Sequence, residues 1–196
     1  MLPRSVRVTN LDAFRIWKET EGLGLDWLMT RLKDETEPSD AMRAGTALHK
    51  GLEQASELEC GSLVSGDYRF DFNCECQVII PTLREIELTK EYGDIAVIGH
   101  ADGIIGKRVV DYKSTETFDP DRYMESYQWR FYLDMSGCDE FWYQVFVVKP
   151  FGPPMCYDVR ETHLLKQYRY PDLHSDCERL VNEYREVMAS ELQVSA

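Results

Sequence analysis

Two aspartates and a lysine lie in a segment that the sequence predicts to be a tight β-hairpin. Two runs rich in isoleucine and valine meet at Gly106-Lys107, a Gly-X pair that is typical of a type II′ turn. With this pair at the tip, the register places Asp102 opposite Asp111. It also places His100 opposite Lys113. Because side chains alternate between the two faces of a strand, all four polar side chains are expected on one face.

The residue types of this face indicate metal-assisted hydrolysis of a phosphodiester. Two carboxylates that face each other, here Asp102 and Asp111, destabilise a strand pair unless a cation lies between them. A divalent cation held there would lower the pKa of a bound water and polarise a phosphoryl group. Lys113 lies about 6.6 Å along the strand from Asp111, where its ammonium could orient the attacking water without a covalent intermediate. The alternative for these three residues is an ordinary salt-bridged pair of strands.

A helix predicted over about 40 to 59 could bring a histidine to this face. Gly45, Leu48, His49 and Leu52 recur at helical spacing along one stripe, so His49 points toward the surface on which the stripe packs. The missing side chain of Gly45 would let the helix approach a neighbour closely. The alternative is a core or half-exposed histidine on an amphipathic helix.

A second helix, predicted over about 120 to 135, could bring an amide and a hydroxyl. Asp119-Pro120 supplies an N-cap and then a proline in the first helical position. Gln128 and Tyr132 form an i, i+4 pair on one side of this helix. Most buried tyrosines are core residues with one satisfied hydroxyl, so the pair indicates a functional site only together with the hairpin.

The remaining segments predict the sheet and helices that would position these side chains. Apolar periodicity indicates an N-terminal helical region over 9–33, capped by Thr9-Asn10 and broken near Gly22 and Gly24, strands within 66–90 including a run over 76–80, a buried strand over 141–148, an outer strand over 155–161, and a C-terminal helix over about 171–191. Glu85 and Glu87 share one strand face, so either could be an additional metal or water ligand, or both could be solvated. The order predicts an α/β (α+β mixed) fold, a central mixed β-sheet flanked by helices, in one domain over 1–196 with its motif-bearing core at about 40–150.

Length and charge limit the partners of the chain. Its 196 residues, 43% of them hydrophobic, are enough for one domain with a sizeable core. A formal net charge of -13 does not suggest general adhesion to nucleic acid or to an anionic membrane, so a nucleic-acid partner would need a local basic patch and a metal. The candidate phosphate contacts that flank the motifs are Arg43, Lys50, Arg122 and Arg130. The acidic remainder could dock a protein partner.

Targeting signals and cysteine usage point to a cytoplasmic protein. The amino-terminal residues lack the apolar core of a signal peptide, and no run approaches the roughly 18 apolar residues of a membrane span. The six cysteines are scattered through a chain that can build its own core, so free thiols are expected. Cys74 and Cys76 are close, but no second pair has a matching spacing, which makes them poor evidence for zinc or an iron–sulfur cluster.

Three motifs together resemble those of a known nuclease family. Asp102 followed by Asp111-Tyr112-Lys113 resembles the signature of the PD-(D/E)XK nuclease superfamily. Two further motifs are similar to its RecB-like exonuclease branch: Gly45-Thr46-Ala47-Leu48-His49 followed by Leu52-Glu53 resembles the helical histidine motif, and Gln128-Trp129-Arg130-Phe131-Tyr132 matches the Gln-x-x-x-Tyr motif. The proline that names the superfamily is absent, since Ala101 precedes Asp102. No cysteine precedes Cys60, so the resemblance is to a stand-alone member without an iron–sulfur cluster.

The resemblance implies a site and a cofactor. The fold would contain a restriction-endonuclease-like core, and the cofactor would be Mg²⁺ or Mn²⁺. The implied metal ligands are Asp102, Asp111, the carbonyl oxygen of Tyr112 and a nitrogen of His49. Lys113 would be the catalytic lysine, and Gln128 with Tyr132 would position substrate or water beside it. The motif gives His100 no role.

The implied function is that of a metal-dependent DNA nuclease. In the first instance it would be an exonuclease that hydrolyses phosphodiester bonds at DNA ends or in single strands during recombination, replication or repair. A small chain without a helicase motif would suit a virus or mobile element, and hence the host cytoplasm. Two alternatives stay open: a non-catalytic module on a nuclease fold that binds protein or nucleic acid, and a structure-specific or site-specific endonuclease.

Overall fold

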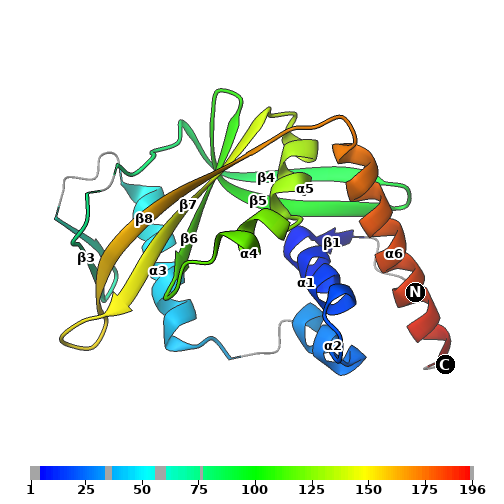
Figure 1. The fold of residues 1–196 in the computed structure, drawn as a ribbon, viewed down its shortest axis with the longest axis horizontal. Coiled ribbons are helices and arrows are strands. Elements are labelled where there is room, and N and C mark those ends of the chain that lie inside the picture. The colour runs from blue at the N-terminus through cyan, green and yellow to red at the C-terminus, as the bar shows by residue number, and fades with distance from the viewer. Residues whose placement is uncertain (1–4, 34–36, 56–60, 76, 195–196) are drawn as a thin grey trace.

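The computed structural model describes residues 5–33, 37–55, 61–75 and 77–194 and shows one long twisted sheet with helices packed on it (Figure 1). The described elements are, in order, β1 (Ser5–Arg7), α1 (Val8–Glu19), α2 (Leu25–Lys33), α3 (Asp40–Gln54), β2 (Ser62–Ser65), β3 (Tyr68–Phe72), β4 (Leu83–Tyr92), β5 (Ile95–Ile105), β6 (Arg108–Thr115), α4 (Pro120–Glu125), α5 (Gln128–Ser136), β7 (Glu140–Pro150), β8 (Cys156–Tyr168) and α6 (Leu173–Val194). Within these ranges no helix has the length and apolar character needed to cross a bilayer. The predicted α/β fold with a central mixed β-sheet flanked by helices is confirmed.

The sheet is mixed, and β5 is the strand at which it divides. Its strands lie in the order β1-β5-β6-β7-β8-β3-β2, and β4 pairs with β5 off this path. The pairs β1 with β5, β6 with β7, and β3 with β8 are parallel, and the other neighbours are antiparallel. β4 follows one edge of β5, whereas the other edge is shared between β1, at residues 96–98, and β6, at residues 103–105. Residues 99–102 of that edge therefore have no partner among the described strands, and the sheet splits there.

Alternating side chains place an apolar core on each face of the sheet. Val109 of β6 packs into a cluster with α1, α5 and α6, whereas the next residue, Val110, packs on the opposite face against α3. The same alternation puts Tyr112 on the α3 face. Asp111 and Lys113, at the intervening positions, belong to the face of α1 and α5.

The predicted hairpin forms, but its ladder ends earlier than the register implies. Gly106 has a φ of 57°, as a tight turn with glycine in its first central position requires. Pairing of β5 with β6 stops at Gly103 and Val110. The predicted backbone pair of Asp102 with Asp111 is therefore absent, because the strands have already begun to separate.

His100 does not face Lys113, contrary to the predicted register. It pairs with Glu87 of β4, and its Nε2 lies 3.2 Å from a carboxylate oxygen of that residue. Both side chains are largely exposed. The physical reason is that the pairing of β6 with β5 ends at Gly103, so that among the described strands His100 pairs with β4 alone.

The helices differ from prediction mainly at their ends. α1 begins at Val8 with Arg7 as its N-cap, which supplies no side-chain hydrogen bond, so the predicted cap at Thr9-Asn10 is wrong. The predicted break between α1 and α2 is confirmed, and Gly22 has a φ of 84° there. α3 ends at Gln54, and the predicted helical residues beyond position 55 lie outside the described residues. α6 covers the predicted C-terminal helix.

Two predicted elements are interrupted by side chains that bind the backbone. Residues 77–80 form no strand, because the Gln144 amide accepts a hydrogen bond from the Ile79 amide (2.9 Å) and donates to the Gln77 carbonyl (2.8 Å). The predicted helix over about 120 to 135 is two helices, α4 and α5. Between them the Ser126 hydroxyl accepts from the Gln128 amide at 3.1 Å and marks the start of α5.

The structural part of Cys138 and Cys177 is packing, because both are buried in the core cluster on the face of α1, α5 and α6. Cys138, Cys156 and Cys177 are free thiols, as expected. Cys60 and Cys76 lie outside the described residues.

The outer strand predicted over 155–161 is longer than expected and runs to Tyr168, since it pairs along the whole of β7.

Candidate active site

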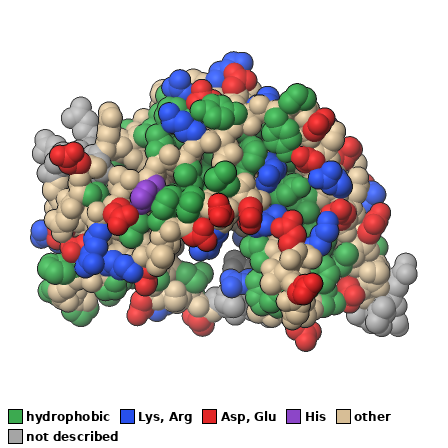
Figure 2. Space-filling view, in the orientation of Figure 1, with side chains coloured by type: hydrophobic (Ala, Val, Ile, Leu, Met, Phe, Trp, Pro, Cys, Tyr) green, Lys and Arg blue, Asp and Glu red, His purple; other side chains and the backbone are tan. Residues whose placement is uncertain are grey.

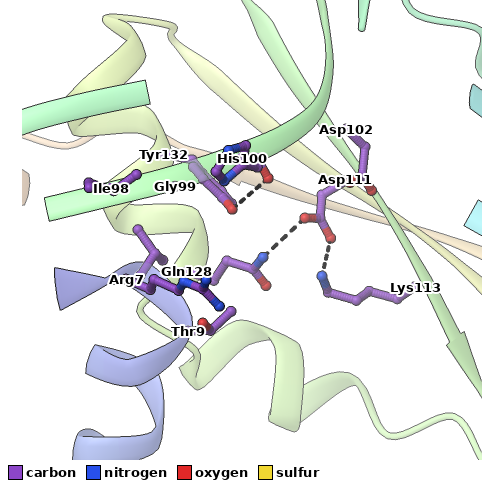
Figure 3. A pocket seen from close by; sticks show the side chains of 11 residues that line it. Arg7, Thr9, Ile98, Gly99, His100, Asp102, Asp111, Lys113, Gln128 and Tyr132 are labelled. Carbon is purple, nitrogen blue, oxygen red and sulfur yellow. Dashed lines mark hydrogen bonds and ion pairs between the residues drawn. The ribbon is translucent and has the colours of Figure 1, made fainter. Parts of the chain in front are cut away.

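A pocket of about 430 Å³ lies at the split in the sheet (Figure 3). β5 and β6 supply its polar wall, α5 supplies one side, and the junction of β1 with α1 supplies another. Its lining residues are Arg7, Val8, Thr9, Ile98, Gly99, His100, Asp102, Asp111, Lys113, Gln128 and Tyr132. The five residues predicted to be catalytic are all among them: Asp102, Asp111, Lys113, Gln128 and Tyr132.

Asp111 is the centre of the polar network in this pocket. Its side chain is 2% exposed, and its Oδ2 lies 2.5 Å from Nζ of Lys113, two positions further along the same face of β6. Its Oδ1 accepts a hydrogen bond from Nε2 of Gln128 at 3.1 Å. Gln128 comes from the first turn of α5. The sheet and α5 therefore hold one carboxylate from two sides, as the dashed lines in Figure 3 show.

Asp102 closes the gap that opens between β5 and β6. Its Oδ2 accepts a hydrogen bond from the backbone amide of Tyr112 at 2.6 Å. Continuing the hairpin register would pair Tyr112 with Ala101, so the side chain of Asp102 takes the place of a backbone acceptor. In an antiparallel ladder the N–H and C=O of one residue face the same neighbouring strand, so the carbonyl of Tyr112 also faces this gap.

His49 reaches the gap from the opposite face of the sheet. α3 buries Leu48 completely against β6, as the predicted apolar stripe requires. Close packing depends on Gly45, because a Cβ at that position would lie 2.6 Å from Oγ of Ser114. His49 Nδ1 then lies 3.7 Å from Oδ2 of Asp102. The helix and the hairpin therefore meet at the same carboxylate.

Tyr132 anchors α5 to the stretch of β5 where the edge shared by β1 and β6 has no described partner. Its hydroxyl donates to the carbonyl of His100 at 2.8 Å, and its ring stacks on Phe141. Gly99 makes room for the ring, since a Cβ there would lie 2.4 Å from a ring carbon of Tyr132. The hydroxyl that was predicted to position substrate or water is engaged with the protein backbone.

Burial and charge set the protonation of the site. Burial raises the pKa of Asp111 to about 6, although the Lys113 ammonium acts in the opposite direction. Burial alone would lower the pKa of Lys113, but Asp111 and Asp102 outweigh it and raise this pKa above its ordinary value. Burial, with help from Lys113, lowers the pKa of His49 to about 4. At neutral pH Lys113 is therefore a cation, and His49 is neutral with a free nitrogen lone pair.

The structure gives a place beside the site to Glu53, which the sequence analysis named in the histidine motif without a role, and it distinguishes Glu85 from Glu87. Glu53 lies one turn after His49 on α3, an i, i+4 spacing that could have revealed it. Glu85 lies across from Asp102 in the register of β4, whereas Glu87 pairs with an exposed histidine. Burial, and then the charge and hydrogen bond of Glu53, raise the pKa of Glu85 to about 7. Glu85 also has a φ of 50°, which side chains rarely adopt.

These donors fit a hard divalent cation that keeps part of its water. Among the described residues, no three His, Cys, Asp or Glu side chains are arranged to cage a metal by themselves. The Oδ2 atom of Asp111 is nevertheless buried without a well-aligned hydrogen bond, its close partner being the Lys113 ammonium. Burial and the negative charge of neighbouring carboxylates raise the pKa values of Asp111, Asp102 and Glu85, and a cation would offset both effects. One or two carboxylates plus water is the usual environment of Mg²⁺.

The basic residues predicted to contact phosphates are scattered. Arg43 pairs with Asp40 at 2.7 Å and lines a groove beside the turn between β7 and β8. Lys50 is exposed on α3. Arg130 donates to backbone carbonyls at the end of α4 and so braces the junction with α5. Arg122 lines a groove next to the active-site pocket.

The fold resembles those of solved structures, one of which is an exonuclease. No family model and no curated protein sequence matches the chain. The crystal structure of SSO0001 is 17% identical over 93% of this chain and 76% of its own, with a TM-score of 0.53. The alkaline exonuclease LHK-Exo from Laribacter hongkongensis is 13% identical over 97% of this chain and 91% of its own, with a TM-score of 0.51. Its complex with dAMP gives the same identity and coverage and a TM-score of 0.53. At these identities the likeness shows a shared fold.

Proposed function

We propose that this protein is a metal-dependent nuclease that hydrolyses phosphodiester bonds in DNA. The observation that carries this function is one buried carboxylate, Asp111, held between the Lys113 ammonium and the Gln128 amide in an open pocket that Asp102 also lines. These residues belong to motifs that resemble those of the PD-(D/E)XK superfamily. The fold shared with LHK-Exo supports the same function.

Four side chains of the pocket have assigned roles in this function. Lys113 keeps its proton, so it places positive charge where the scissile phosphate gains negative charge during attack by water. Gln128 fixes the orientation of the Asp111 carboxylate through its hydrogen bond. Tyr132 and Asp102 act as positioning residues, because they bind the backbone at either side of the split.

Mg²⁺ or Mn²⁺ would be held by Asp102, Asp111, the carbonyl oxygen of Tyr112 and a nitrogen of His49, with Glu53 and Glu85 close by. When bound, the metal supplies a water of lowered pKa and a Lewis acid for the phosphoryl oxygen. A neutral imidazole among oxygen donors shifts the preference toward Mn²⁺. The low pKa of His49 leaves this nitrogen unprotonated throughout the neutral range.

The form of nuclease that we propose is an exonuclease acting at DNA ends or on single strands. A pocket of about 430 Å³ has the size of a site for one small ligand such as a nucleotide. LHK-Exo is an alkaline exonuclease whose structure was solved with dAMP. The resemblance of the histidine and Gln-x-x-x-Tyr motifs to the RecB-like branch supports the same form, with a role in recombination, replication or repair in a virus or mobile element.

Linear and closed circular DNA, each incubated with Mn²⁺ and with EDTA, test this function. Metal-dependent loss of the linear substrate with the circle intact is expected. Cutting of the circle would indicate an endonuclease instead, and a folded chain that binds DNA but cuts neither substrate would indicate a non-catalytic module. Asp111→Asn is the inactive variant, and Asp139→Asn is its matched control, because Asp139 is exposed and lies outside the pocket.

A further inference from the structure

A second groove lies next to the active-site pocket, along α1. It has a volume of about 310 Å³ and lies between α1, α2, the start of α3 and α4. Arg7 and Thr9 line both cavities, so the two are adjacent. We call it the arginine groove and define it by Arg7, Thr9, Trp27, Arg31, Met42 and Arg122. Figure 2 shows a notch between the part of the molecule that contains α3 and the part that contains α1 and α2.

The arginine groove is basic in a chain whose formal net charge is -13. Arg31 and Arg122 are exposed, and neither forms an ion pair with a residue that the structure describes. Asp12 is the acidic residue of the described lining, and its Oδ1 already accepts hydrogen bonds from Arg15 Nε (3.3 Å) and from the Tyr127 amide (2.8 Å). A polyanion in this groove would meet two arginines without a described counter-charge.

Trp27 gives the groove a flat apolar wall beside this charge. The ring is half-buried, and the guanidinium of Arg31, one turn further along α2, lies 5.5 Å from its centroid. Met42 at the start of α3 is 52% exposed and adds a second apolar contact. An aromatic face next to arginines is the combination with which proteins bind single-stranded nucleic acids, because bases stack on the ring while phosphates pair with the cations.

We propose that the arginine groove binds a single strand of DNA that leads into the active-site pocket. Phosphates would lie at Arg31 and Arg122, and a base would stack on Trp27. Cavities of about 310 and 430 Å³ each have the size of a site for one small ligand, which suits successive nucleotides of one strand. The direction of the strand rests on the proposed nuclease function, whereas its binding does not require cleavage.

Binding of a fluorescein-labelled mixed-sequence oligodeoxynucleotide to the full chain, followed by anisotropy in EDTA, tests this assignment. In Arg31→Ala/Arg122→Ala the slope of log Kd against log salt should shrink by about 1.4, because each phosphate contact with a single strand contributes about 0.7. Trp27→Ala should bind roughly 5- to 150-fold more weakly, the range for loss of one stacked base, and Trp27→Phe should retain most of the affinity. Arg160→Ala, which removes an exposed arginine of β8 outside both cavities, should match the wild type.

Several outcomes overturn the assignment. A salt slope in Arg31→Ala/Arg122→Ala equal to that of Arg160→Ala would do so, and so would a duplex that binds as tightly as the single strand. Because Trp27 packs partly against the core, the arginine pair and Trp27→Phe carry the test if Trp27→Ala does not fold. Groove-dependent binding without any cleavage in Mn²⁺ refutes the proposed nuclease function alone. Cleavage with unaltered binding in the groove variants refutes the groove alone.

Discussion

The carboxylate of Asp102 accepts the backbone amide of Tyr112 at 2.6 Å, at the point where β6 leaves β5. The side chain of Asp102 thus accepts a hydrogen bond from a backbone amide that has no partner in the β5–β6 pairing. In the proposed function the same side chain also binds the metal. The two tasks can be separated by chemistry. An asparagine oxygen can still accept the amide hydrogen bond, but it carries no negative charge for a cation.

Asp102→Asn is therefore expected to fold with nearly wild-type stability and to bind Mn²⁺ far more weakly. Asp102→Ala loses the acceptor as well, which should cost about 1–3 kcal/mol because a buried amide is left unsatisfied. Urea unfolding measures the stability, and calorimetric titration with Mn²⁺ measures the binding. Both measurements are made at pH 8, so that Asp111, with a pKa of about 6, and Glu85, with a pKa of about 7, are charged. Wild-type affinity in Asp102→Asn would contradict a ligand role.

Lys113→Ala is expected to keep the fold and to lose DNA cleavage by at least about 100-fold, the scale of removing one preorganised charge from a transition state. The fold survives because Asp111, without its cation, has its already raised pKa raised further and can take up a proton. Circular dichroism and a cleavage time course in Mn²⁺ measure the two properties. Lys107→Ala, at the exposed tip of the same hairpin, is the control and should cleave normally. Cleavage by Lys113→Ala at the control rate would refute the assigned role.

Gly99→Ala should destabilise the protein and weaken cleavage together. A Cβ there would lie 2.4 Å from the ring of Tyr132, which is held by its hydrogen bond to the His100 carbonyl and by stacking on Phe141. Overpacking of this kind costs about 1–3 kcal/mol. Thermal melts and cleavage rates of Gly99→Ala measure these two effects. Gly24→Ala is the control, because no atom lies within 4 Å of a Cβ added there. If both variants melt alike, Tyr132 is not confined as described.

Asp134 of α5 binds partners from two other elements. Its Oδ2 accepts from the Tyr92 hydroxyl (2.6 Å) and lies 3.0 Å from Nζ of Lys90, both on β4, and 2.9 Å from Nδ1 of His174 on α6. Burial alone would raise the pKa of Asp134, but hydrogen bonds from these three residues outweigh it and lower the pKa. The carboxylate therefore ties α5 and α6 to the sheet in its charged form.

Asp134→Asn should lower the free energy of unfolding at pH 7 by about 2 kcal/mol, the scale of hydrogen bonds to a charged group. A depressed pKa in the folded state contributes stability that is present above the ordinary value of 3.8 and is lost as the pH falls through the folded-state pKa. The difference between variant and wild type should therefore shrink below about pH 4. Urea unfolding between pH 7 and pH 3 measures it. A difference that stays constant over this range would show that the charge of Asp134 is not the cause.

The side chains that share one face of a single strand could be predicted from the sequence, because their placement depends only on alternation along that strand. The turn at Gly106 and the shared face of Asp111 and Lys113 follow from local pattern, and the structure has both. The apolar stripe around His49 follows in the same way from helical spacing. Local pattern cannot tell where two paired strands separate, because that depends on β1, which is far away in the chain.

The same limit explains the residues that sequence reasoning missed or left undecided. Glu85 and Glu87 lie on the same face of β4, so alternation along that strand cannot distinguish them. The register of β4 with β5 is what places Glu85 across from Asp102. Glu53 shares a hydrogen bond with Glu85 across two elements that no local pattern relates. The interruption at residues 77–80 likewise depends on a glutamine of β7.

The pairing of β1 with β5 has a consequence for the time at which the pocket can exist. Val6 pairs with Val97, and the wall that Arg7 contributes is completed by Gln128 and Tyr132, which are synthesised much later. A chain emerging from the ribosome gains such distant contacts only after the intervening segments are available to close the loop. The nascent polypeptide therefore cannot complete this pocket until Tyr132 has been translated.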